Sequence, residues 1–562
     1  MKKTLRRALQ NIMMKAAAVV SAAVMMISSA GCCVYAKKAQ KYTAKDFVHA
    51  DGTKLIGADG KEFLIKGIAF GNNVWSNPSV PAYSHHDEKA YKELAAMGFN
   101  CIRFYLNYGL FESDNDPYRY KKTGFDWIDK NIKWAKKYGI KLILNMHVPQ
   151  GGYQSTGGGT ELWTKKSNGD RLTALWKAIA KRYANEPAVI GYGLVNEPVV
   201  PMLETPEKTF EQYDSLMKKI AKNIRKASPY QMMFIEGICS VVKEDGERVY
   251  DLFTLENCFA MIKDKNIAYE VHDYDPFFFT HQNTEWAGTF GKTMEYPSEE
   301  VVGEEVKVGW VDFVSAKKAS AKQNGWAYFE SGFASLSGKA NIVQPAVAAP
   351  YLGENGTAYF DDIVFTEISP SGRRRVLFST DFTGGVFNSG VWSSDGSGVS
   401  EYCADDGFKG KGCLKISGTE AMFVQNFKRF EMKKGYKYTI SGYIRSDRDT
   451  PEIKMDLSLS ENVYCFDNDY LEAGIKKFVK FSEDKNVPIY LGEFGVISEG
   501  FEQGRNGIGW VRDMISLCEK YGISFNYHTF NENPFGLYDE YPKGKNKELA
   551  DLFKKILKKK QT

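Results

Sequence analysis

The sequence predicts an α/β protein: a (β/α)8 barrel with an all-β domain, of jelly-roll or β-sandwich type, inserted between the sixth strand and the sixth helix. Two observations predict this fold. Eight short apolar runs alternate with amphipathic helical patterns over residues 46–297 and 459–562, as expected for parallel strands covered by helices. Between residues 298 and 458 the alternation gives way to short strand patterns separated by turn residues, which is typical of a sandwich.

Residues 1–36 have the layout of a secretory signal peptide. They contain five cationic and no acidic side chains, and the apolar run Ala16–Ile27 is too short to span a bilayer. Val34-Tyr35-Ala36 fits cleavage after Ala36, so we expect a secreted, extracellular protein. Ser29-Ala30-Gly31-Cys32 resembles a lipoprotein box without its usual leucine, so a lipid anchor at Cys32 on the cell surface is the alternative. No later run is long enough to predict a transmembrane segment.

Charge and cysteine content exclude several classes of function. The net charge is +5, from 74 Lys and Arg against 69 Asp and Glu, and residues 1–36 account for all of the excess. Nucleic-acid binding needs a basic stripe that displaces counterions, so nucleic acid is not an expected partner. The seven cysteines after the signal lack the C-x-x-C spacing of a metal site. Only Cys403 and Cys413 merit a test for a disulfide.

The barrel is predicted from its strands and helices in order. The expected strands are Phe63–Phe70, Cys101–Leu106, Lys141–Met146, Val189–Val195, Met232–Glu236, Ile267–Val271, Pro488–Gly492 and Ile523–Tyr527. Helical patterns between them cover Asp87–Met97, Asp126–Tyr138, Leu172–Tyr183, Phe210–Lys226 and Trp510–Tyr521. Several of these helices end at a glycine or proline that introduces the next strand, as in Tyr138-Gly139 and Ser228-Pro229.

The inserted domain is predicted over residues 298–458. Strand patterns there cover Ala358–Thr366, Cys413–Ser417, Tyr436–Ile444 and Glu452–Leu459, with Gly-Ser-rich connections such as Ser393–Ser400. The barrel is then formed by residues 46–297 together with 459–562.

Polar side chains cluster at the carboxyl ends of the predicted barrel strands, where the reactive residues of this fold lie. In chain order these residues are Arg103, His147, Asn196, Glu197, His272, Tyr274, Glu493 and His528. Glu197 and Glu493 follow the fourth and seventh strands, so we expect them to face each other across the barrel mouth. Two carboxylates so placed can flank a glycosidic bond, one protonating the leaving oxygen and the other attacking the anomeric carbon. A salt bridge to Arg103 or a helix cap is the structural alternative for either glutamate.

The ordered motifs resemble family 5 glycoside hydrolases, the barrel family that includes cellulases. The matching segments are FNCIRF (99–104), LILNMH (142–147), IGYGLVNEP (190–198), YEVHDYDPFFFTHQ (269–282) and PIYLGEFG (488–495). The resemblance implies that Glu197 is the general acid/base and that Glu493 is the nucleophile of a retaining mechanism, with carboxyl groups about 5–5.5 Å apart. It also implies supporting roles for the other residues. Asn196 would bind the sugar 2-hydroxyl, Arg103 and Tyr274 would orient Glu493 and keep it ionised, and His147 and His272 would line the cleavage subsite.

One departure from the family concerns the sugar platform after strand eight. The family usually has a tryptophan there, but residues 523–538 contain none, so either Phe525, Tyr527 or His528 replaces it or the subsite is remodelled, which leaves the preference between glucose and mannose open. Trp75, Trp163 and Trp286 fall on loops after strands one, three and six. Each is expected either to stack on sugars or to form loop core.

The inserted segment resembles jelly-roll carbohydrate-binding modules. AYFDDIVFTE (358–367) resembles their closing strand, and GCLKISGTEAMFVQNF (412–427) and GYKYTISGYIRSD (435–447) resemble their early strands. Because the closing strand comes first here, the resemblance implies a circular permutation. It also implies a structural Ca²⁺, for which Asp362 and Asp381 are the nearest ligand matches. Trp326, Trp392 and Tyr402 are candidate sugar platforms, with burial in the core as the alternative.

Together these patterns predict a secreted, retaining endo-β-1,4-glucanase of the cellulase type that hydrolyses β-linked plant polysaccharide. We expect a monomer that needs no cofactor or metal for catalysis. A β-mannanase, a xyloglucanase or another β-glucan hydrolase of the same family is the nearest alternative. An alternative of another class is a non-catalytic surface glycan-binding protein, against which the intact Glu197 and Glu493 argue.

Overall fold

A computed structural model describes residues 42–558 of the chain. The exceptions are 77–78, 156, 300, 303–305, 311–324, 337–339, 350–351, 353–354, 384–390, 394–397, 410–411, 419–422, 448–452 and 462–463. The predicted signal peptide, its two processing sites and the lipid-anchor alternative at Cys32 lie outside the described residues.

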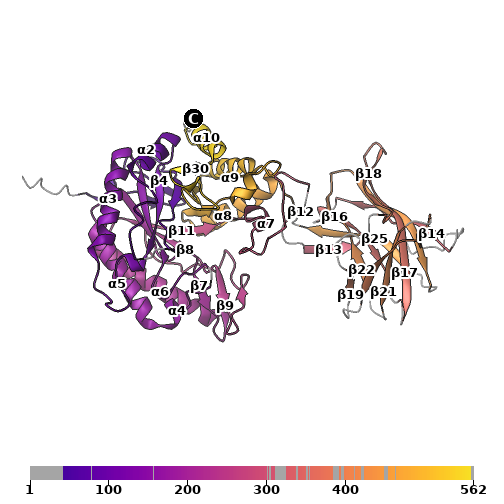
Figure 1. Ribbon diagram of the computed structural model, residues 1–562, viewed down its shortest axis with the longest axis horizontal. Coiled ribbons are helices and arrows are strands. Elements are labelled where there is room, and N and C mark those ends of the chain that lie inside the picture. The colour runs from indigo at the N-terminus through magenta and orange to yellow at the C-terminus, as the bar shows by residue number, and fades with distance from the viewer. Residues whose placement is uncertain are drawn as a thin grey trace, which may run out of the picture.

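Eight parallel strands close into a barrel, as the sequence predicts (Figure 1). In chain order they are β3 (Lys66–Phe70), β4 (Cys101–Asn107), β5 (Lys141–Val148), β6 (Val189–Gly193), β8 (Met232–Glu236), β11 (Ile267–His272), β27 (Ile489–Phe494) and β28 (Ser524–Tyr527). Each strand pairs with the next one in this order, and β28 pairs with β3 to complete the ring. The fold class of the barrel is thereby confirmed.

The longer helices pack around the barrel. They are α2 (Glu88–Met97), α3 (Lys122–Tyr138), α5 (Lys166–Tyr183), α6 (Pro206–Ala227), α8 (Asn468–Lys485), α9 (Gly507–Tyr521) and α10 (Lys547–Ile556). Gly98, Gly139 and Gly522 end α2, α3 and α9 in the left-handed conformation that glycine adopts without strain. The predicted ends of these helices are therefore correct. The starts of α3 and α5 lie four to six residues earlier than predicted, because their first turns are polar and carry no apolar periodicity.

The barrel interior changes from apolar to polar along the strands. Alternate residues of a strand point to the same side, and the inward row of β4 runs from Cys101 through Arg103 to Tyr105, all buried. Cys101 belongs to an apolar cluster that fills the barrel near the amino-terminal ends of the strands. Above it, close packing leaves no room for a side chain beside Glu270, since a Cβ at residue 492 would lie 1.9 Å from Glu270 Oε1. Gly492 thus lets a carboxylate enter the barrel next to Glu493.

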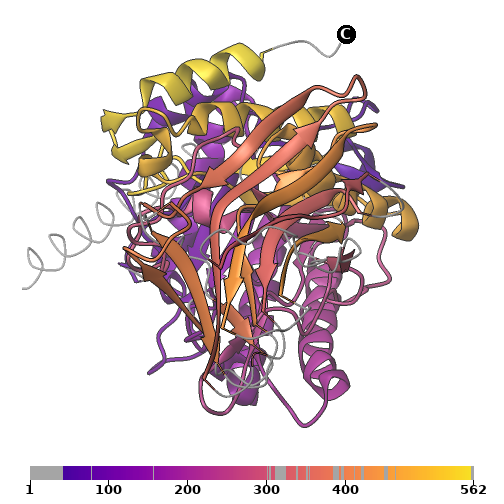
Figure 2. The same ribbon diagram turned by 90° about the vertical axis from the view of Figure 1, so that its right-hand side faces the viewer.

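A second, all-β body lies between β11 and α8 in the chain, beside the barrel (Figure 1), and Figure 2 views it with the barrel behind it. One of its sheets has the order β13-β25-β16-β22-β19 with β23 beside β16, and the other has the order β14-β24-β17-β21-β20 with β15 and β18 at its sides. The strands are β13 (Val306–Trp310), β14 (Ala327–Glu330), β15 (Ala334–Ser335), β16 (Ile342–Ala348), β17 (Gly356–Ile368), β18 (Arg374–Thr380), β19 (Val391–Ser393), β20 (Val399–Cys403), β21 (Cys413–Gly418), β22 (Phe423–Asn426), β23 (Phe430–Glu431), β24 (Lys437–Ser446) and β25 (Lys454–Glu461). Residues from both sheets share one core, which includes Val343, Phe360 and Leu457, so the two sheets form a sandwich.

The chain leaves the barrel and returns to it side by side. Strand β12 (Val301–Val302) pairs antiparallel with β26 (Tyr464–Cys465), and the Ser298 backbone N–H donates to Phe466 O at 2.8 Å. Phe466 packs on Phe279 with ring centroids 5.0 Å apart. The predicted boundary at residue 458 falls inside β25, which continues to Glu461 because its last residues pair with β13 and β16. The return to the barrel therefore comes several residues later than predicted.

Short elements complete the barrel body. They are η1 (Ala44–Asp46), β1 (His49–Asp51), β2 (Lys54–Ile56), η2 (Tyr108–Leu110), α4 (Glu161–Thr164), β7 (Val199–Pro201), β9 (Ser240–Val242), β10 (Arg248–Val249), α7 (Phe277–Thr280), η3 (Ser498–Phe501), β29 (Tyr538–Glu540) and β30 (Lys543–Lys545). Within the described part of the chain, no helix combines the length and apolar character needed to cross a bilayer. The seven described cysteines are free thiols, and Cys403 and Cys413 face each other across β20 and β21.

Candidate active site

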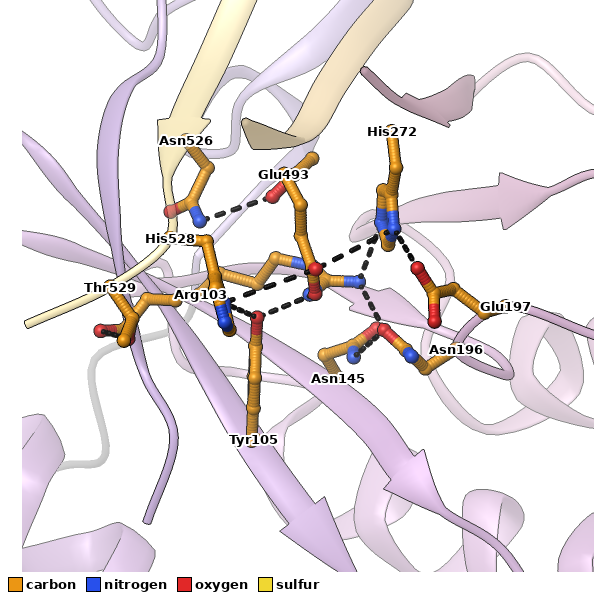
Figure 3. Close-up of polar contacts among 12 residues, drawn as sticks. Arg103, Tyr105, Asn145, Asn196, Glu197, His272, Glu493, Asn526, His528 and Thr529 are labelled. Carbon is orange, nitrogen blue, oxygen red and sulfur yellow. Dashed lines mark hydrogen bonds and ion pairs between the residues drawn. The ribbon is translucent and has the colours of Figure 1, made fainter. Parts of the chain in front are cut away.

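Glu493 lies near the end of β27, with Arg103, Tyr105 and His272 around its carboxylate (Figure 3). Tyr274 is a fourth side chain that holds this carboxylate in place. Arg103 Nη1 and the Tyr105 hydroxyl both donate to Glu493 Oε1 at 2.6 Å. The Tyr274 hydroxyl donates to Oε2 at 2.9 Å, and His272 Nδ1 lies 3.6 Å from that oxygen. Arg103 and Tyr274 therefore contact Glu493, as the family resemblance implies, and His272 lies beside it at the barrel mouth. Tyr105 is a partner that the sequence reasoning missed.

Glu197 follows β6 in a backbone conformation that is unusual for a residue with a side chain. Its φ is +41°, in the left-handed region, which costs a non-glycine residue about 1–3 kcal/mol. Strain of this kind persists only where the surroundings impose it, and such residues cluster at functional sites. The Glu197 side chain is 21% exposed, and its Oε1 lies 2.9 Å from His272 Nδ1. The strained turn thus places a carboxylate at the barrel mouth.

The two carboxylates are close together. One oxygen of Glu197 and one of Glu493 lie within 4.8 Å of each other, and His272 Nδ1 lies 2.9 Å from Glu197 Oε1 and 3.6 Å from Glu493 Oε2. Retaining glycosidases have carboxyl groups about 5–5.5 Å apart, whereas inverting enzymes need about 6.5–9.5 Å to admit a water molecule. The spacing at this mouth therefore suits direct attack by one carboxylate.

Electrostatics keep Glu493 ionised. Burial alone would raise the pKa of its carboxyl, but the neighbouring histidines and the Arg103 guanidinium outweigh burial and hold that pKa well below its usual range. For His272 burial acts in the opposite direction and lowers the pKa. The surrounding carboxylates, foremost Glu493 and Glu236, outweigh burial and raise that pKa well above its usual value. The two flanking carboxylates therefore favour the protonated form of the His272 imidazole.

The pKa of Glu197 is lowered, which is the opposite of the shift that a general acid needs before substrate binds. Burial raises the pKa of its carboxyl, but the hydrogen bond from His272, the charge of His272 and the hydrogen bond from Ser155 together outweigh burial and lower that pKa. A general acid needs a raised pKa. The two pKa shifts together favour the proton on His272 Nδ1, one 2.9 Å hydrogen bond away from Glu197 Oε1.

Arg103 is fully buried and ion-pairs with three carboxylates from three strands. Its Nη2 lies 2.8 Å from Glu236 Oε1, its Nε 2.7 Å from Glu270 Oε1, and its Nη1 2.6 Å from Glu493 Oε1. A buried guanidinium is stable only when it is paired in this way. The Glu236 and Glu270 partners were missed by the sequence reasoning, although each is an acidic residue within an apolar strand run. That cost of burial is the signal that could have identified them.

Asn196 and His147 also lie at the mouth, as predicted. Asn196 Oδ1 accepts from Arg103 Nη2 at 2.9 Å (Figure 3), which leaves its amide nitrogen facing Ser155 Oγ at 3.3 Å. His147 stacks on Tyr105 with ring centroids 3.9 Å apart. Burial lowers the pKa of His147 to about 3, so this histidine is a neutral, apolar surface at the site.

Of the three candidates to replace the missing tryptophan, only His528 is at the mouth. Phe525 and Tyr527 are fully buried in the packing of the barrel strands against their helices. The His528 Nδ1 lies 3.1 Å from the Tyr105 hydroxyl and 3.9 Å from Glu493 Oε2. Of these alternatives the structure excludes Phe525 and Tyr527, because the alternation of β28 turns both rings away from the mouth.

The tryptophans divide between the site and the loop core. Trp75 is 40% exposed and lies 5.7 Å from the His147 ring, so it borders the mouth. Trp286 is 66% exposed, and its ring lies 5.5 Å from that of His281, which in turn lies 5.1 Å from the ring of Tyr274. Trp163 is buried and donates to Gln154 Oε1 at 3.0 Å, which makes it loop core.

Two groups of described side chains have the composition and closeness of cation ligands: Glu197, His272 and Glu493, and Glu236, Glu270 and His272. Arg103 already contributes positive charge to both groups. The predicted calcium ligands belong to neither. Asp362 Oδ2 ion-pairs with Lys409 Nζ at 2.5 Å, and Asp381 Oδ1 accepts from the Thr383 hydroxyl at 2.6 Å. An ammonium group on Asp362 does not fit a calcium ligand.

The candidate platforms of the sandwich also differ in exposure. Trp326 is buried in the sandwich, 2% exposed, whereas Tyr402 is 38% exposed. The Trp392 side chain lies outside the described part of the structure. Trp326 is therefore not available as a sugar platform, because Arg445 and Phe408 cover its ring.

The chain matches one protein-family model and several proteins of known name. The family model for cellulase (glycosyl hydrolase family 5) matches residues 56–360, which include Glu197 and end before Glu493. Endoglucanase C of Acetivibrio thermocellus is 32% identical over 215 residues, covering 38% of this chain and 58% of that protein. A beta-xylosidase of Phanerodontia chrysosporium is 26% identical over 270 residues, covering 42% of this chain and 53% of that protein.

A solved structure described as an endoglucanase superimposes with a TM-score of 0.46 at 15% identity, covering 87% of this chain and 96% of that one. The chain spans little more than half the length of the two curated relatives above.

Proposed function

Because the chain belongs to glycosyl hydrolase family 5, we propose that it is a retaining endo-β-1,4-glucanase, with Glu493 as nucleophile and Glu197 as general acid/base. The observation that carries this proposal is the pair of carboxylates within 4.8 Å at the barrel mouth, one of them fixed by Arg103, Tyr105 and Tyr274. The relatives named endoglucanase support glucan as the polymer.

In the first step Glu493 attacks the anomeric carbon while Glu197 protonates the leaving oxygen. Three donors hold the Glu493 oxygens, so little reorganisation is needed as the carboxylate loses its charge. The required proton starts on His272 Nδ1 and crosses the 2.9 Å hydrogen bond to Glu197 Oε1 as charge develops on the leaving oxygen. His272 becomes neutral, and the aglycone departs with the proton.

In the second step Glu197, again a carboxylate, takes a proton from water as the water attacks the anomeric carbon. The C–O bond to Glu493 breaks, and Glu493 regains its negative charge beside Arg103. The product keeps the β configuration, and the proton on Glu197 can return to His272. Asn196 is in place to hold the sugar 2-hydroxyl through its amide, and His147 and His528 line the sugar's surroundings.

The proposed mechanism predicts retention of configuration. Cello-oligosaccharides incubated with the enzyme should first yield the β-anomer of the new reducing end, which ¹H NMR resolves before mutarotation. On carboxymethylcellulose, viscosity should fall faster than reducing ends accumulate, as endo cleavage requires. An α-anomer as the first product contradicts the retaining assignment, and unchanged viscosity during sugar release contradicts endo action.

A second candidate polymer has one observation in its favour. His528 occupies the position where the family usually has an aromatic platform, and Glu532 Oε2 lies 3.8 Å from His528 Nε2. This polar wall suits a subsite remodelled for another β-linked sugar, and one relative is named a beta-xylosidase. Mannan, xyloglucan, mixed-linkage glucan and xylan should therefore be assayed beside cellulose. A higher kcat/KM on any of these polymers than on cellulose would change the assigned substrate and leave the mechanism unchanged.

We also propose that the protein is secreted through the segment 1–36 and that the sandwich binds polysaccharide. Strands β12 and β26 bring the two ends of the sandwich together, so residues 306–461 can be replaced by a short Gly-Ser linker. In a Glu493→Ala background, this deletion should reduce retention on insoluble cellulose by on the order of tenfold or more, because a second attachment point is lost. In the active background, kcat/KM on a soluble glucan should stay unchanged. Equal retention with and without the sandwich would favour a structural role.

A further inference from the structure

Glu236 is the last residue of β8, the barrel strand between β6 and β11. Its side chain is 5% exposed and points into the network beneath the catalytic pair. In register it lies directly beside Glu270 of β11. The mechanism proposed above assigns Glu236 no step.

The two carboxylate oxygens of Glu236 have different partners. Oε2 accepts from the backbone N–H of Glu197 at 2.6 Å, and Oε1 pairs with Arg103 Nη2 at 2.8 Å. The backbone carbonyl of Glu236 accepts from the Tyr213 hydroxyl of α6, which fixes the end of the strand. One side chain thus ties the Glu197 backbone to the guanidinium that holds Glu493.

The contact with Glu197 is made at its strained backbone. Glu197 has a φ of +41°, and a residue with a side chain keeps such a conformation only when its surroundings impose it. The hydrogen bond from the Glu197 N–H to a carboxylate is short and charge-assisted, which makes it one of the stronger bonds available to a backbone amide. A change of the turn would move the Glu197 carboxyl away from His272.

The charged groups around Glu236 come from every neighbouring strand. Arg103 is on β4, Glu270 and His272 are on β11, Glu197 follows β6, and Glu493 on β27 shares Arg103. His272 Nε2 lies 3.5 Å from Glu236 Oε2. Burial raises the pKa of Glu236 to about 8, with His272 and Arg103 opposing the shift and Glu270 adding to it. The Glu236 carboxylate lies 3.5 Å from the imidazole that supplies Glu197.

We propose that Glu236 is a positioning residue for acid/base catalysis: it fixes the Glu197 turn through the backbone N–H and couples that turn to Arg103 and His272. This inference rests on the proposed function. It predicts that loss of Glu236 impairs proton transfer at Glu197 more than nucleophilic attack by Glu493, whose three donors remain in place.

The test compares Glu236→Ala and Glu236→Gln with wild type on two aryl β-cellobiosides. The 2,4-dinitrophenyl glycoside leaves without protonation, whereas the 4-methylphenyl glycoside needs a general acid. Glu236→Ala should lower kcat/KM for the methylphenyl substrate by about 100-fold, the scale of general acid catalysis. For the dinitrophenyl substrate the loss should stay below about threefold. Glu236→Gln, which keeps an oxygen for the Glu197 N–H, should recover part of the loss, and it carries the test should Glu236→Ala not fold.

Glu112 provides a matched control. It is buried, pairs with Arg171 Nε at 2.8 Å, and accepts from the backbone N–H of Tyr118, which also has a positive φ. Glu112→Ala removes the same kind of contact away from the catalytic pair, so any loss it causes should be equal on the two substrates. Equal losses on both substrates for the Glu236 variants, or no loss, overturn the inference. Wild type that cleaves neither substrate overturns the proposed function and this inference together.

Discussion

Glu493→Ala should reduce hydrolysis of β-glucan by on the order of 10⁴-fold or more, the scale of loss when a central catalytic residue is removed. No other described carboxylate accepts hydrogen bonds from Arg103, Tyr105 and Tyr274 together. Reducing-sugar release from a soluble β-glucan measures the effect. Glu499→Ala, on the loop after the same strand, is the control and should retain wild-type rates. Comparable activity of Glu493→Ala and wild type would refute the assignment of the nucleophile.

Azide distinguishes loss of the nucleophile from general damage to the site. With Glu493 shortened to alanine, azide can enter from the face that the carboxylate vacates and attack an activated β-glycoside. The product should be the α-glycosyl azide, because a single displacement inverts the anomeric carbon. A β-glycosyl azide from this variant would instead mean that Glu493 is the acid/base residue.

Glu197→Ala should have the second largest effect, and its size should depend on the leaving group. On polysaccharide, where the leaving oxygen must be protonated, the expected loss is about 10²–10⁴-fold. With 2,4-dinitrophenyl cellobioside, formation of the glycosyl-enzyme should remain fast, but its hydrolysis lacks a general base. The glycosyl-enzyme should therefore accumulate, with kcat falling far more than kcat/KM.

Added azide should raise kcat of Glu197→Ala on the activated substrate and give the β-glycosyl azide. Azide needs no general base to attack the glycosyl-enzyme, and two inversions restore the β configuration. Thr205→Ala, which removes the cap of the following helix α6, serves as a control outside the site. A uniform loss on both substrates would mean that Glu197 acts only through the structure.

Much of the barrel could be predicted from sequence because its signals are local. The glycines after Met97, Tyr138 and Tyr521 terminate helices by themselves, and the strand run Met232–Glu236 matches β8 residue for residue. Helix starts were less accurate, as for α5, whose first turn begins at Lys166 in a polar stretch. Apolar periodicity cannot mark a turn that faces solvent.

Site residues that follow the end of a strand could be predicted from the sequence. Site residues whose position depends on the register between strands could not. Glu270 lies within β11, and only the register that sets it beside Glu236 and the space left by Gly492 shows that it enters the barrel. Tyr105 similarly lies within the β4 run, and its bond to Glu493 joins residues almost 400 positions apart. Such long-range pairings leave no trace in local pattern.

The end of the sandwich was also misplaced for a non-local reason. The strand pattern of β25 weakens after Leu459, but the strand continues to Glu461 because β13 and β16 are both there to pair with it. The choice among Phe525, Tyr527 and His528 likewise depended on which face of β28 opens to the mouth.

The most direct test of the account is covalent trapping of the nucleophile. An activated 2-deoxy-2-fluoro-β-cellobioside slows both steps of the reaction, so a glycosyl-enzyme should accumulate and inactivate the protein in proportion to its formation. Mass spectrometry should find one added fluorocellobiosyl group per chain, located on Glu493 in the peptide containing Pro488–Gly495. Attachment to Glu197, or full turnover with no covalent adduct at any time, would contradict a double displacement through Glu493.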